Sequence, residues 1–243
     1  MDNVHVITYA TKSFGMFDEL VNNKYNVPVT VLGMGKKWYG FRDKITAYRD
    51  YMADLPPDDI VVVVDGFDTK INGRLETAVE IFKRKNVPIL VSKDTIPFYR
   101  EWYIKKIFGT YDNVNTANSG LFMGYAKNLY PMLNEISFMK CGDDQRNMNT
   151  VCAKHEVSID TEREIFHNLC KEYRKNKSDA IFIGYPGSMS WNRVTRGMRE
   201  YPQFFYKEIV VLLILLSIAF PRLWLINSII ILILSFYCDI SCI

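Results

Sequence analysis

The sequence contains few of the residues from which zinc sites and covalent hydrolases are usually built. It has five cysteines and three histidines among 243 residues. The cysteines form no CxxC pair and show no zinc-ligand spacing, so we expect reduced thiols. The histidines, His5, His155 and His167, are too scattered to form a ligand pair. No Ser/His/Asp or Cys/His arrangement predicts covalent hydrolysis.

The chain also lacks a strong excess of charge of either sign. Its formal net charge is +3, and no segment concentrates Lys and Arg. We therefore expect no nucleic-acid binding, because nucleic-acid-binding domains usually gather basic residues on one face. The glycines of Gly33–Lys37 are too few for a phosphate-binding loop. Hydrophobic residues make up 49% of the chain, which excludes a disordered protein.

The hydrophobic residues are unevenly distributed. The stretch from Ile209 to Cys238 carries one charged residue, Arg222. Two apolar segments, about 209–220 and 223–238, would rise about 18 and 24 Å as helices, each short of the roughly 30 Å hydrocarbon core of a bilayer. One kinked span, one span with an interfacial helix and a two-helix hairpin all remain open. Each predicts that residues 207–243 form an anchor in membrane lipid.

The charges on either side of this anchor predict its orientation. Arg193, Arg196, Arg199 and Lys207 precede the apolar segments, and of the charged residues only Asp239 follows them. Because basic residues are retained on the cytoplasmic side of membranes, we expect residues 1–206 to face the cytoplasm.

Residues 1–206 have the pattern of one α/β domain. Short apolar runs predict strands over 4–10, 27–33, 58–65 and 87–91, and helical spacing of apolar residues predicts helices over 43–54 and 74–85. The run at 58–65 does not alternate, which is typical of a strand covered on both faces of a parallel sheet. We expect a Rossmann-like, mostly parallel central sheet with flanking helices, and a functional site at the carboxyl ends of its strands.

Two aspartates follow this buried strand. Asp65 and Asp68, with Gly66 between them, could converge on a divalent cation that carries a diphosphate. Alternatively, Asp65 caps a turn and Asp68 is a solvated loop residue. An aspartyl-phosphate phosphatase is disfavoured, because its Asp-x-Asp-x-Thr signature has one residue between the two aspartates, whereas two residues separate Asp65 from Asp68.

Two further polar clusters lie downstream. Asn118 and Ser119 lead into an apolar strand and could hydrogen-bond a sugar or a ribose, or form an ordinary turn. Asp143 and Asp144 are adjacent carboxylates, which is costly unless a cation or a hydroxyl donor faces them. A solvated helix start capped by one aspartate is at least as good an interpretation of this pair.

Taken in order, these segments resemble the glycosyltransferase domain of the procollagen lysyl hydroxylase family. The likeness covers about residues 4–191 and is carried by residues 6–12, 31–38, 64–68, 118–126, 143–145, 159–160 and 165–169. It implies a type-A glycosyltransferase fold that uses manganese and a UDP-sugar donor. The hydroxylase portion of the family has no counterpart in this sequence, so we expect neither iron nor 2-oxoglutarate.

The resemblance also implies roles for individual residues near the nucleotide. By matching position, Asp65 and Asp68 would bind the metal and, through it, the donor diphosphate. Thr8 and Trp38 would lie against the nucleotide, and Phe67 would lie beside the uracil.

The sugar and acceptor side would be lined by Asn118, Asp143 and Asp144. A type-A fold leaves open whether the anomeric configuration is retained or inverted. In an inverting reaction Asp143 or Asp144 would be the candidate general base.

One departure from the family concerns its metal-binding histidine and diphosphate-facing lysine, which are replaced here by Gly184 and Ser190. Arg193 or Arg196 could supply the missing cation. The sequence thus predicts a membrane-anchored transferase that moves glucose or galactose from UDP-glucose or UDP-galactose to a protein or glycan hydroxyl, hydroxylysine of collagen-like protein by family likeness. The alternative is a catalytically inactive nucleotide- or glycan-binding module at a membrane.

Overall fold

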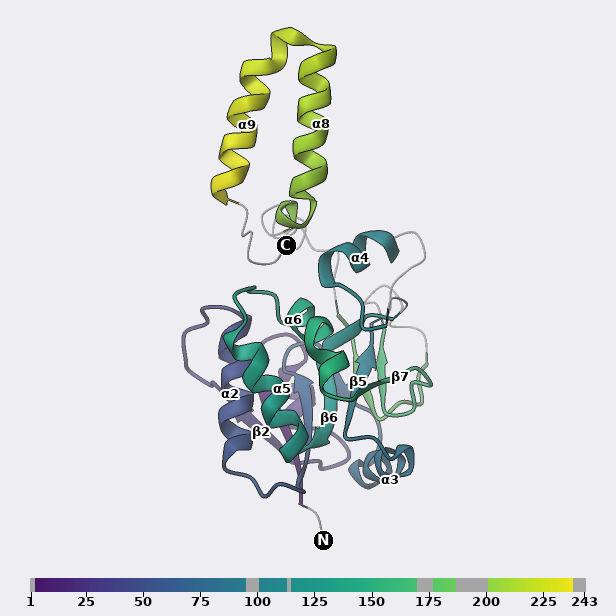
Figure 1. Cartoon of the computed structure of the whole chain (residues 1–243). Helices are drawn as coiled ribbons and strands as arrows, with labels where there is room; N and C mark the ends of the chain where they lie inside the picture. Colours follow the sequence, from purple (N-terminus) through teal and green to yellow (C-terminus); the bar gives the residue numbers. More distant parts are fainter. Residues whose placement is uncertain (1–2, 95–100, 113–114, 170–176, 187–200, 238–243) are drawn as a thin grey trace. The chain divides into compact units, whose positions relative to one another are not determined.

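The computed structural model describes residues 3–94, 101–112, 115–169, 177–186 and 201–237. The chain divides into two compact units, Met1–Ser188 and Met189–Ile243, which we call the head and the tail. Figure 1 shows the elements of both units in chain order.

A six-stranded sheet forms the centre of the head. Its strand order is β2 (Val29–Leu32), β1 (Val4–Tyr9), β3 (Ile60–Asp65), β6 (Ala117–Tyr125), β5 (Ile89–Lys93) and β7 (Val157–Asp160). All neighbouring strands pair in parallel except β6, which runs antiparallel to β3 and β5. The expected mostly parallel α/β sheet is confirmed. Because β6 runs in the opposite direction, its first residues lie at the edge where β3 and β5 end.

Both faces of this sheet are covered, which explains the unbroken apolar run of β3. Helices α2 (Phe41–Ala53) and α5 (Ala126–Phe138) pack together on one face (Figure 1). On the other face lie α3 (Leu75–Lys85) and a small sheet in the order β4 (Thr69–Ile71), β9 (Phe182–Gly184) and β8 (Phe166–Asn168). The residues Ile60–Val64 are at most 1% exposed, and full burial of each contributes about 1.5–3 kcal/mol.

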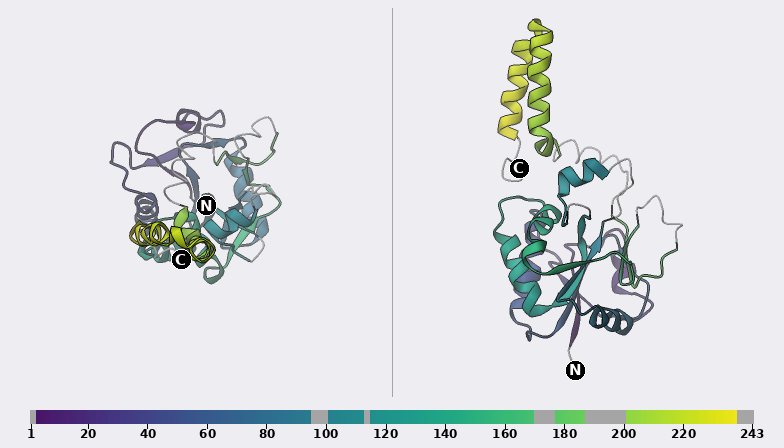
Figure 2. Two further views of the ribbon diagram at one scale, coloured as in Figure 1. Left: turned by 90° about the horizontal axis from the view of Figure 1, so that it is seen from above. Right: turned by 45° about the vertical axis from the view of Figure 1, so that its right-hand side comes forward.

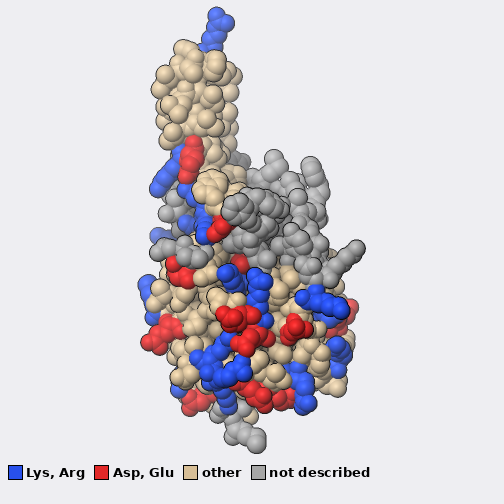
Figure 3. All heavy atoms as spheres, turned by 90° about the vertical axis from the view of Figure 1, so that its right-hand side faces the viewer, with Lys and Arg blue, Asp and Glu red and all other residues tan. Residues whose placement is uncertain are grey.

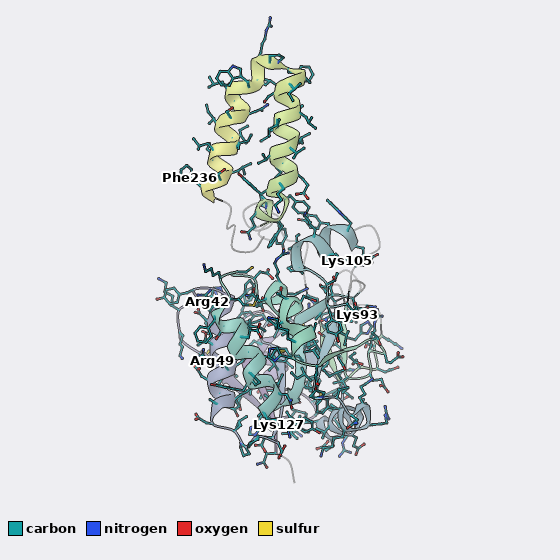
Figure 4. All side chains as sticks on the ribbon, in the orientation of Figure 1. Arg42, Arg49, Lys93, Lys105, Lys127 and Phe236 are labelled. Carbon is teal, nitrogen blue, oxygen red and sulfur yellow. The ribbon has the colours of Figure 1, made fainter. Side chains whose placement is uncertain are left out.

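Two arginines fix α2 against the end of α5. Arg42 Nη2 donates to the carbonyl oxygen of Met139 at 2.7 Å, and Arg49 Nη1 donates to Ser137 Oγ at 3.0 Å (Figure 4). These bonds join α2, at its first turn and past its middle, to the carboxyl-terminal end of α5. The first turn of α2, which enters the candidate site described below, therefore has a defined position.

The remaining described elements of the head are α1 (Phe17–Val21), α4 (Glu101–Phe108), α6 (Asp144–Val151) and the short 3-10 helix η2 (Cys152–Lys154). Every strand and helix that the sequence predicted in the head is present, with ends displaced by no more than two residues. The hydrophobic periodicity was therefore sufficient to locate them.

The tail is a helical hairpin. It consists of η4 (Pro202–Phe205), α8 (Tyr206–Ala219), η5 (Pro221–Leu223) and α9 (Trp224–Tyr237). The helices α8 and α9 lie side by side (Figures 1 and 2). Within the described residues one helix, Pro202–Ala219, is long and apolar enough to cross a membrane by length and composition, and Pro221–Phe236 is apolar but shorter.

The cysteines of the head are not all reduced, contrary to expectation. Cys141 is disulfide-bonded, whereas Cys152 is a buried free thiol. A disulfide can join cysteines at any separation in sequence, so the lack of a spacing motif did not exclude one. Burial raises the pKa of Cys152 to about 12, so this thiol stays protonated and behaves as a small apolar side chain.

Candidate active site

A buried lysine joins two of the candidate aspartates. Lys44, in the first turn of α2, is 5% exposed. Its Nζ lies 3.0 Å from Asp65 Oδ1 and 2.7 Å from Asp144 Oδ2. Burial lowers the pKa of Lys44, but the attraction of Asp144 and Asp65 outweighs burial and raises this pKa well above its ordinary value. Lys44 therefore stays charged and balances the two carboxylates.

The adjacent aspartates at the start of α6 have different roles. Asp144 Oδ2 also accepts a hydrogen bond from Ser119 Oγ at 2.8 Å, so this carboxylate has both the cation and the hydroxyl donor that its position requires. Asp143 instead accepts the backbone N–H of Arg146 at 2.8 Å and caps α6. The capping interpretation thus holds for Asp143, and Asp144 belongs to the buried cluster.

Glycines allow the backbone to approach the Asp65 carboxylate closely. A Cβ atom at Gly120 would lie 2.5 Å from Asp65 Oδ2 and 2.9 Å from Asn118 Oδ1. The Oδ2 atom of Asp65 therefore lies against bare backbone of β6, while Oδ1 faces Lys44. Lys44 fixes one oxygen of this carboxylate and Gly120 leaves room for the other.

A polar network continues along the same edge of the sheet. Asn118 is 7% exposed, donates to Gln145 Oε1 at 3.4 Å and to Asp94 Oδ1 at 3.5 Å, and accepts the backbone N–H of Gly120 at 2.9 Å. Gln145 Nε2 donates to Asp94 Oδ2 at 2.8 Å. Asn118 is therefore part of a network that joins β5, β6 and α6, and Asp94 is its partly exposed end.

Trp38, which was predicted to lie against the nucleotide, is in an exposed loop. Trp38 is 44% exposed, and its ring centroid lies 5.8 Å from that of Tyr9 and 5.6 Å from that of Phe41. Tyr9 pairs with Asp65 in the register of β1 and β3. Through Tyr9, the loop that carries Trp38 reaches the strand end that carries Asp65.

The turn between β3 and β4 is fixed by its backbone. The carbonyl oxygen of Phe67 accepts the N–H of Met16 at 2.9 Å, and that of Asp68 accepts the N–H of Tyr185 at 2.7 Å. The half-buried Phe67 ring packs edge-on against Phe14 at 5.9 Å. Phe67 and the partly exposed Asp68 thus occupy defined positions directly after Asp65.

Thr8 lies beneath this turn. It is fully buried, and within the described part of the chain its Oγ1 has no hydrogen-bond partner. A Cβ atom at Gly66 would lie 3.0 Å from this oxygen. The Thr8 side chain is therefore inaccessible from solvent in this conformation and underlies the turn that follows Asp65.

Gly184, which the resemblance placed at the position of a family histidine, sits in a filled space. Gly184 pairs with Asn168 in the small sheet, and a Cβ atom there would collide with Asn168 Oδ1 and lie 3.0 Å from Leu121 Cδ1. Asn168 is 1% exposed and is held by hydrogen bonds to Ser92 Oγ and the Lys93 carbonyl oxygen, both at 3.0 Å. A side chain at position 184 would require Asn168 to move.

The described residues offer a partial set of metal ligands. Among them, no group of three or more His, Cys, Asp or Glu side chains is arranged to hold a metal ion. Asp65 and Asp68 offer carboxylate oxygens, and a hard cation can be held by one or two carboxylates together with substrate phosphates. The chemistry of these two side chains is therefore that expected for a cation that binds together with a diphosphate. Ser190, Arg193 and Arg196 lie outside the described residues.

Sequence reasoning missed Lys44 and Asp94. Lys44 follows the same helical spacing as Tyr48 and Met52, which lie on the buried face of α2. A lysine on an apolar helix face is a signal for a buried cation with an acidic partner. Asp94 directly follows β5, and an acidic residue at the carboxyl end of a central strand is a site candidate by position.

Residues 1–180 match the model of the PLOD GT domain, in which GT denotes glycosyltransferase. The chain belongs to the PLOD glycosyltransferase-domain family. The resemblance inferred from the ordered motifs is thereby confirmed. The mixed α/β architecture with its mostly parallel sheet fits the type-A fold expected of a PLOD glycosyltransferase domain.

Individual relatives are distant and much longer than this PLOD-family chain. It is 25% identical over 195 residues to the procollagen-lysine,2-oxoglutarate 5-dioxygenase of Drosophila melanogaster, covering 69% of this chain and 26% of the relative. It is 26% and 27% identical over 160 residues to procollagen-lysine,2-oxoglutarate 5-dioxygenase 2 of Mus musculus and of Homo sapiens, covering 59% of this chain and 21% of each relative. The chain thus spans about a quarter of the length of these curated relatives or less.

Proposed function

We propose that this chain is a membrane-anchored, metal-dependent glycosyltransferase that moves glucose or galactose from a UDP-sugar to a hydroxyl acceptor. Membership of the PLOD glycosyltransferase-domain family supports the transferase activity. The relatives are named as procollagen-lysine dioxygenases, which favours hydroxylysine of collagen-like chains as the acceptor. The apolar tail supports attachment to a membrane through residues 207–243.

The observation that carries this proposal is the cluster of Lys44, Asp65 and Asp144 at the carboxyl-terminal edge of the sheet. Lys44 fixes the orientation of the Asp65 carboxylate, so the carboxylate is positioned before any substrate arrives. In this proposal Asp65 and Asp68 hold a manganese ion, which when bound would stabilise the negative charge of the departing nucleoside diphosphate.

The neighbouring residues suit the two ends of a nucleotide sugar. Trp38 and Phe67 present aromatic rings to the nucleotide, and Thr8 supports the turn behind them. Asn118 and Asp94 offer an amide and a carboxylate to sugar or acceptor hydroxyls.

If the reaction inverts the anomeric configuration, the structure favours one of the two candidate general bases, Asp143 and Asp144. Asp144 is buried, and its Oδ2 atom is engaged by Lys44 and Ser119. Proton abstraction would then fall to the partly exposed Asp143.

A second function, an inactive binding module, is favoured by one observation. The position of the family histidine is Gly184, and Asn168 fills the space that a side chain there would need. A module of this kind would bind a nucleotide through the same loops without transferring its sugar.

The side of the membrane on which the head resides is indicated by two opposing features. Arg193, Arg196, Arg199 and Lys207 favour the cytoplasm, whereas the disulfide at Cys141 favours an oxidising compartment. The disulfide is the stronger indication, because the cytosol keeps structural cysteines reduced, whereas the distribution of basic residues only favours one orientation over the other. We therefore propose a head on the non-cytoplasmic side, in place of the cytoplasmic one expected from charge.

Release of UDP from UDP-glucose and UDP-galactose tests these proposals. We expect release that depends on manganese and increases when hydroxylysine-containing collagen-like peptides are added, and loss of release in Asp65→Ala. The variant Asp58→Ala is a matched control, because Asp58 forms an exposed ion pair with Lys127 away from the carboxyl-terminal edge. If the chain binds UDP but releases none from either UDP-sugar with any acceptor tested, the binding module would be favoured and the transferase refuted.

A further inference from the structure

Most of the exposed surface of the tail hairpin is apolar. Large side chains along both helices are exposed, for example Leu215 at 57%, Ile226 at 56%, Leu232 at 58% and Phe236 at 83%. Phe236 points away from α8 (Figure 4). Figure 3 shows a surface free of charged side chains along the hairpin, with charge only at its two ends. A helix that packs on protein has one apolar stripe, whereas a helix that is apolar all round suits lipid.

Two pairs of polar side chains join the arms of the hairpin. Asn227 is 6% exposed, and its Nδ2 donates to Ser217 Oγ at 3.0 Å and to the Leu213 carbonyl oxygen at 3.2 Å. Tyr206 and Ser235 share a hydrogen bond of 2.8 Å between their hydroxyl oxygens. The two arms are thus joined by polar contacts near the turn and near the base. Such contacts between helices are favourable in hydrocarbon, where no water can satisfy the same groups.

The residues at the turn are those that prefer a membrane interface. Arg222 lies in η5, between the arms, and Trp224 begins α9 and is 60% exposed. Arginine extends its charged end toward headgroups, and tryptophan favours the boundary between lipid and water. The arms Pro202–Ala219 and Pro221–Phe236 rise about 27 and 24 Å at 1.5 Å per residue. Lys207 and Glu208 lie within the first arm, so its uncharged part, about 18 Å, is clearly shorter than a hydrocarbon core of roughly 30 Å.

We infer that the tail crosses a lipid bilayer as a hairpin, with Arg222 at the far headgroups and the residues before α8 and after α9 on the same side. This inference rests on the membrane attachment proposed above and adds its topology. The head and the carboxyl terminus then share one compartment. In this arrangement local thinning of the bilayer and extension of the Arg222 side chain toward the headgroups accommodate the short arms.

Protection from protease in sealed vesicles from cells that express the full chain tests this topology. Epitope tags are placed at the amino and carboxyl termini of the same chain. The hairpin predicts that both tags are digested together or protected together. Digestion of one tag with protection of the other would establish a single kinked span and overturn the inference.

The position of the turn is tested with Arg222→Cys and a membrane-impermeant maleimide, with the labelled peptide identified by mass. We expect labelling only from the side opposite to the two tags. Labelling from the side of the tags would indicate a hairpin that lies on the membrane surface. Absence of labelling from both sides would indicate a hairpin that ends inside the bilayer. Either result would overturn the crossing.

The pairing of the arms has a separate test. In vesicles, Ser217→Cys combined with Asn227→Cys should form an intramolecular disulfide on oxidation, because the side chains at these two positions are in contact. The control pair, Ser217→Cys with Leu225→Cys, should not, because Leu225 is 54% exposed. Equal cross-linking of both pairs would contradict the hairpin. Extraction of the chain from vesicles by alkaline wash would instead refute membrane attachment itself, which distinguishes the two failures.

Discussion

Replacing Lys44 with methionine should destabilise the head because it leaves a buried carboxylate without its cation. Methionine keeps most of the aliphatic volume and removes only the charge. Asp144 has a side chain that is 6% exposed, whereas the side chain of Asp65 is 37% exposed and can be solvated. Breaking a buried ion pair costs about 3–5 kcal/mol, and a half-exposed one costs little. We therefore expect Lys44→Met to lose about 3 kcal/mol at pH 7, dominated by Asp144.

The stability of the Lys44→Met variant should depend on pH more strongly than the stability of the native chain. Without Lys44, burial would raise the pKa of Asp144 above its unfolded value, so the native state would gain stability when that carboxyl is protonated. The deficit of Lys44→Met should therefore be small near pH 4 and grow as pH rises. In the native chain the raised pKa of Lys44 gives stability that is present below the ordinary lysine pKa and is lost only at higher pH.

Chemical unfolding of the detergent-solubilised full chain, followed by near-UV circular dichroism at pH 4, 5.5 and 7, measures both effects. The double variant Lys44→Met with Asp144→Asn should recover part of the loss, because the unpaired charge is then absent. A loss below about 1 kcal/mol at pH 7, or equal losses at pH 4 and pH 7, would refute the role assigned to Lys44.

The remaining predictions concern backbone space and redox state. Gly120→Ala should displace the Asp65 carboxylate, weaken UDP binding and cost about 1–3 kcal/mol of stability. Gly142→Ala should have none of these effects, because no atom lies within 4 Å of the added Cβ. Equal melting temperatures of the two variants would contradict this prediction. Gly184→Ala should also lower the melting temperature, because its Cβ meets Asn168; unchanged melting would show that the space is not filled. On alkylation of the denatured chain, Cys152 should react without reductant and Cys141 only after reduction; labelling of Cys141 without reductant would exclude its disulfide.

The sequence was informative where local pattern determines structure. The strand β3 could be located because Ile60–Val64 is an unalternating apolar run, and such runs occur where both faces of a sheet are covered. The position of Asp65 at the carboxyl end of that strand then followed from the direction of the chain. The order of residues along the chain was therefore enough to propose the candidate metal ligands at this edge.

Contacts between distant residues could not be read in the same way. Lys44 and Asp144 are 100 positions apart, and only the packing of α2 beside α6 brings them together. Asp143 and Asp144 are adjacent, so their spacing cannot indicate which caps the helix and which enters the cluster. The sequence shows a glycine at position 184, but the occupation of the space beside it by Asn168 depends on the pairing of β8 with β9.

The central claim is that Asp65 and Asp68 hold a divalent cation together with a nucleoside diphosphate. Isothermal titration of the full chain in detergent with UDP, with and without manganese, tests it most directly. We predict UDP binding that requires manganese and is lost in Asp65→Ala and in Asp68→Ala, but kept in Asp58→Ala. UDP binding that is absent, or that is the same without manganese and in both variants, would contradict the claim.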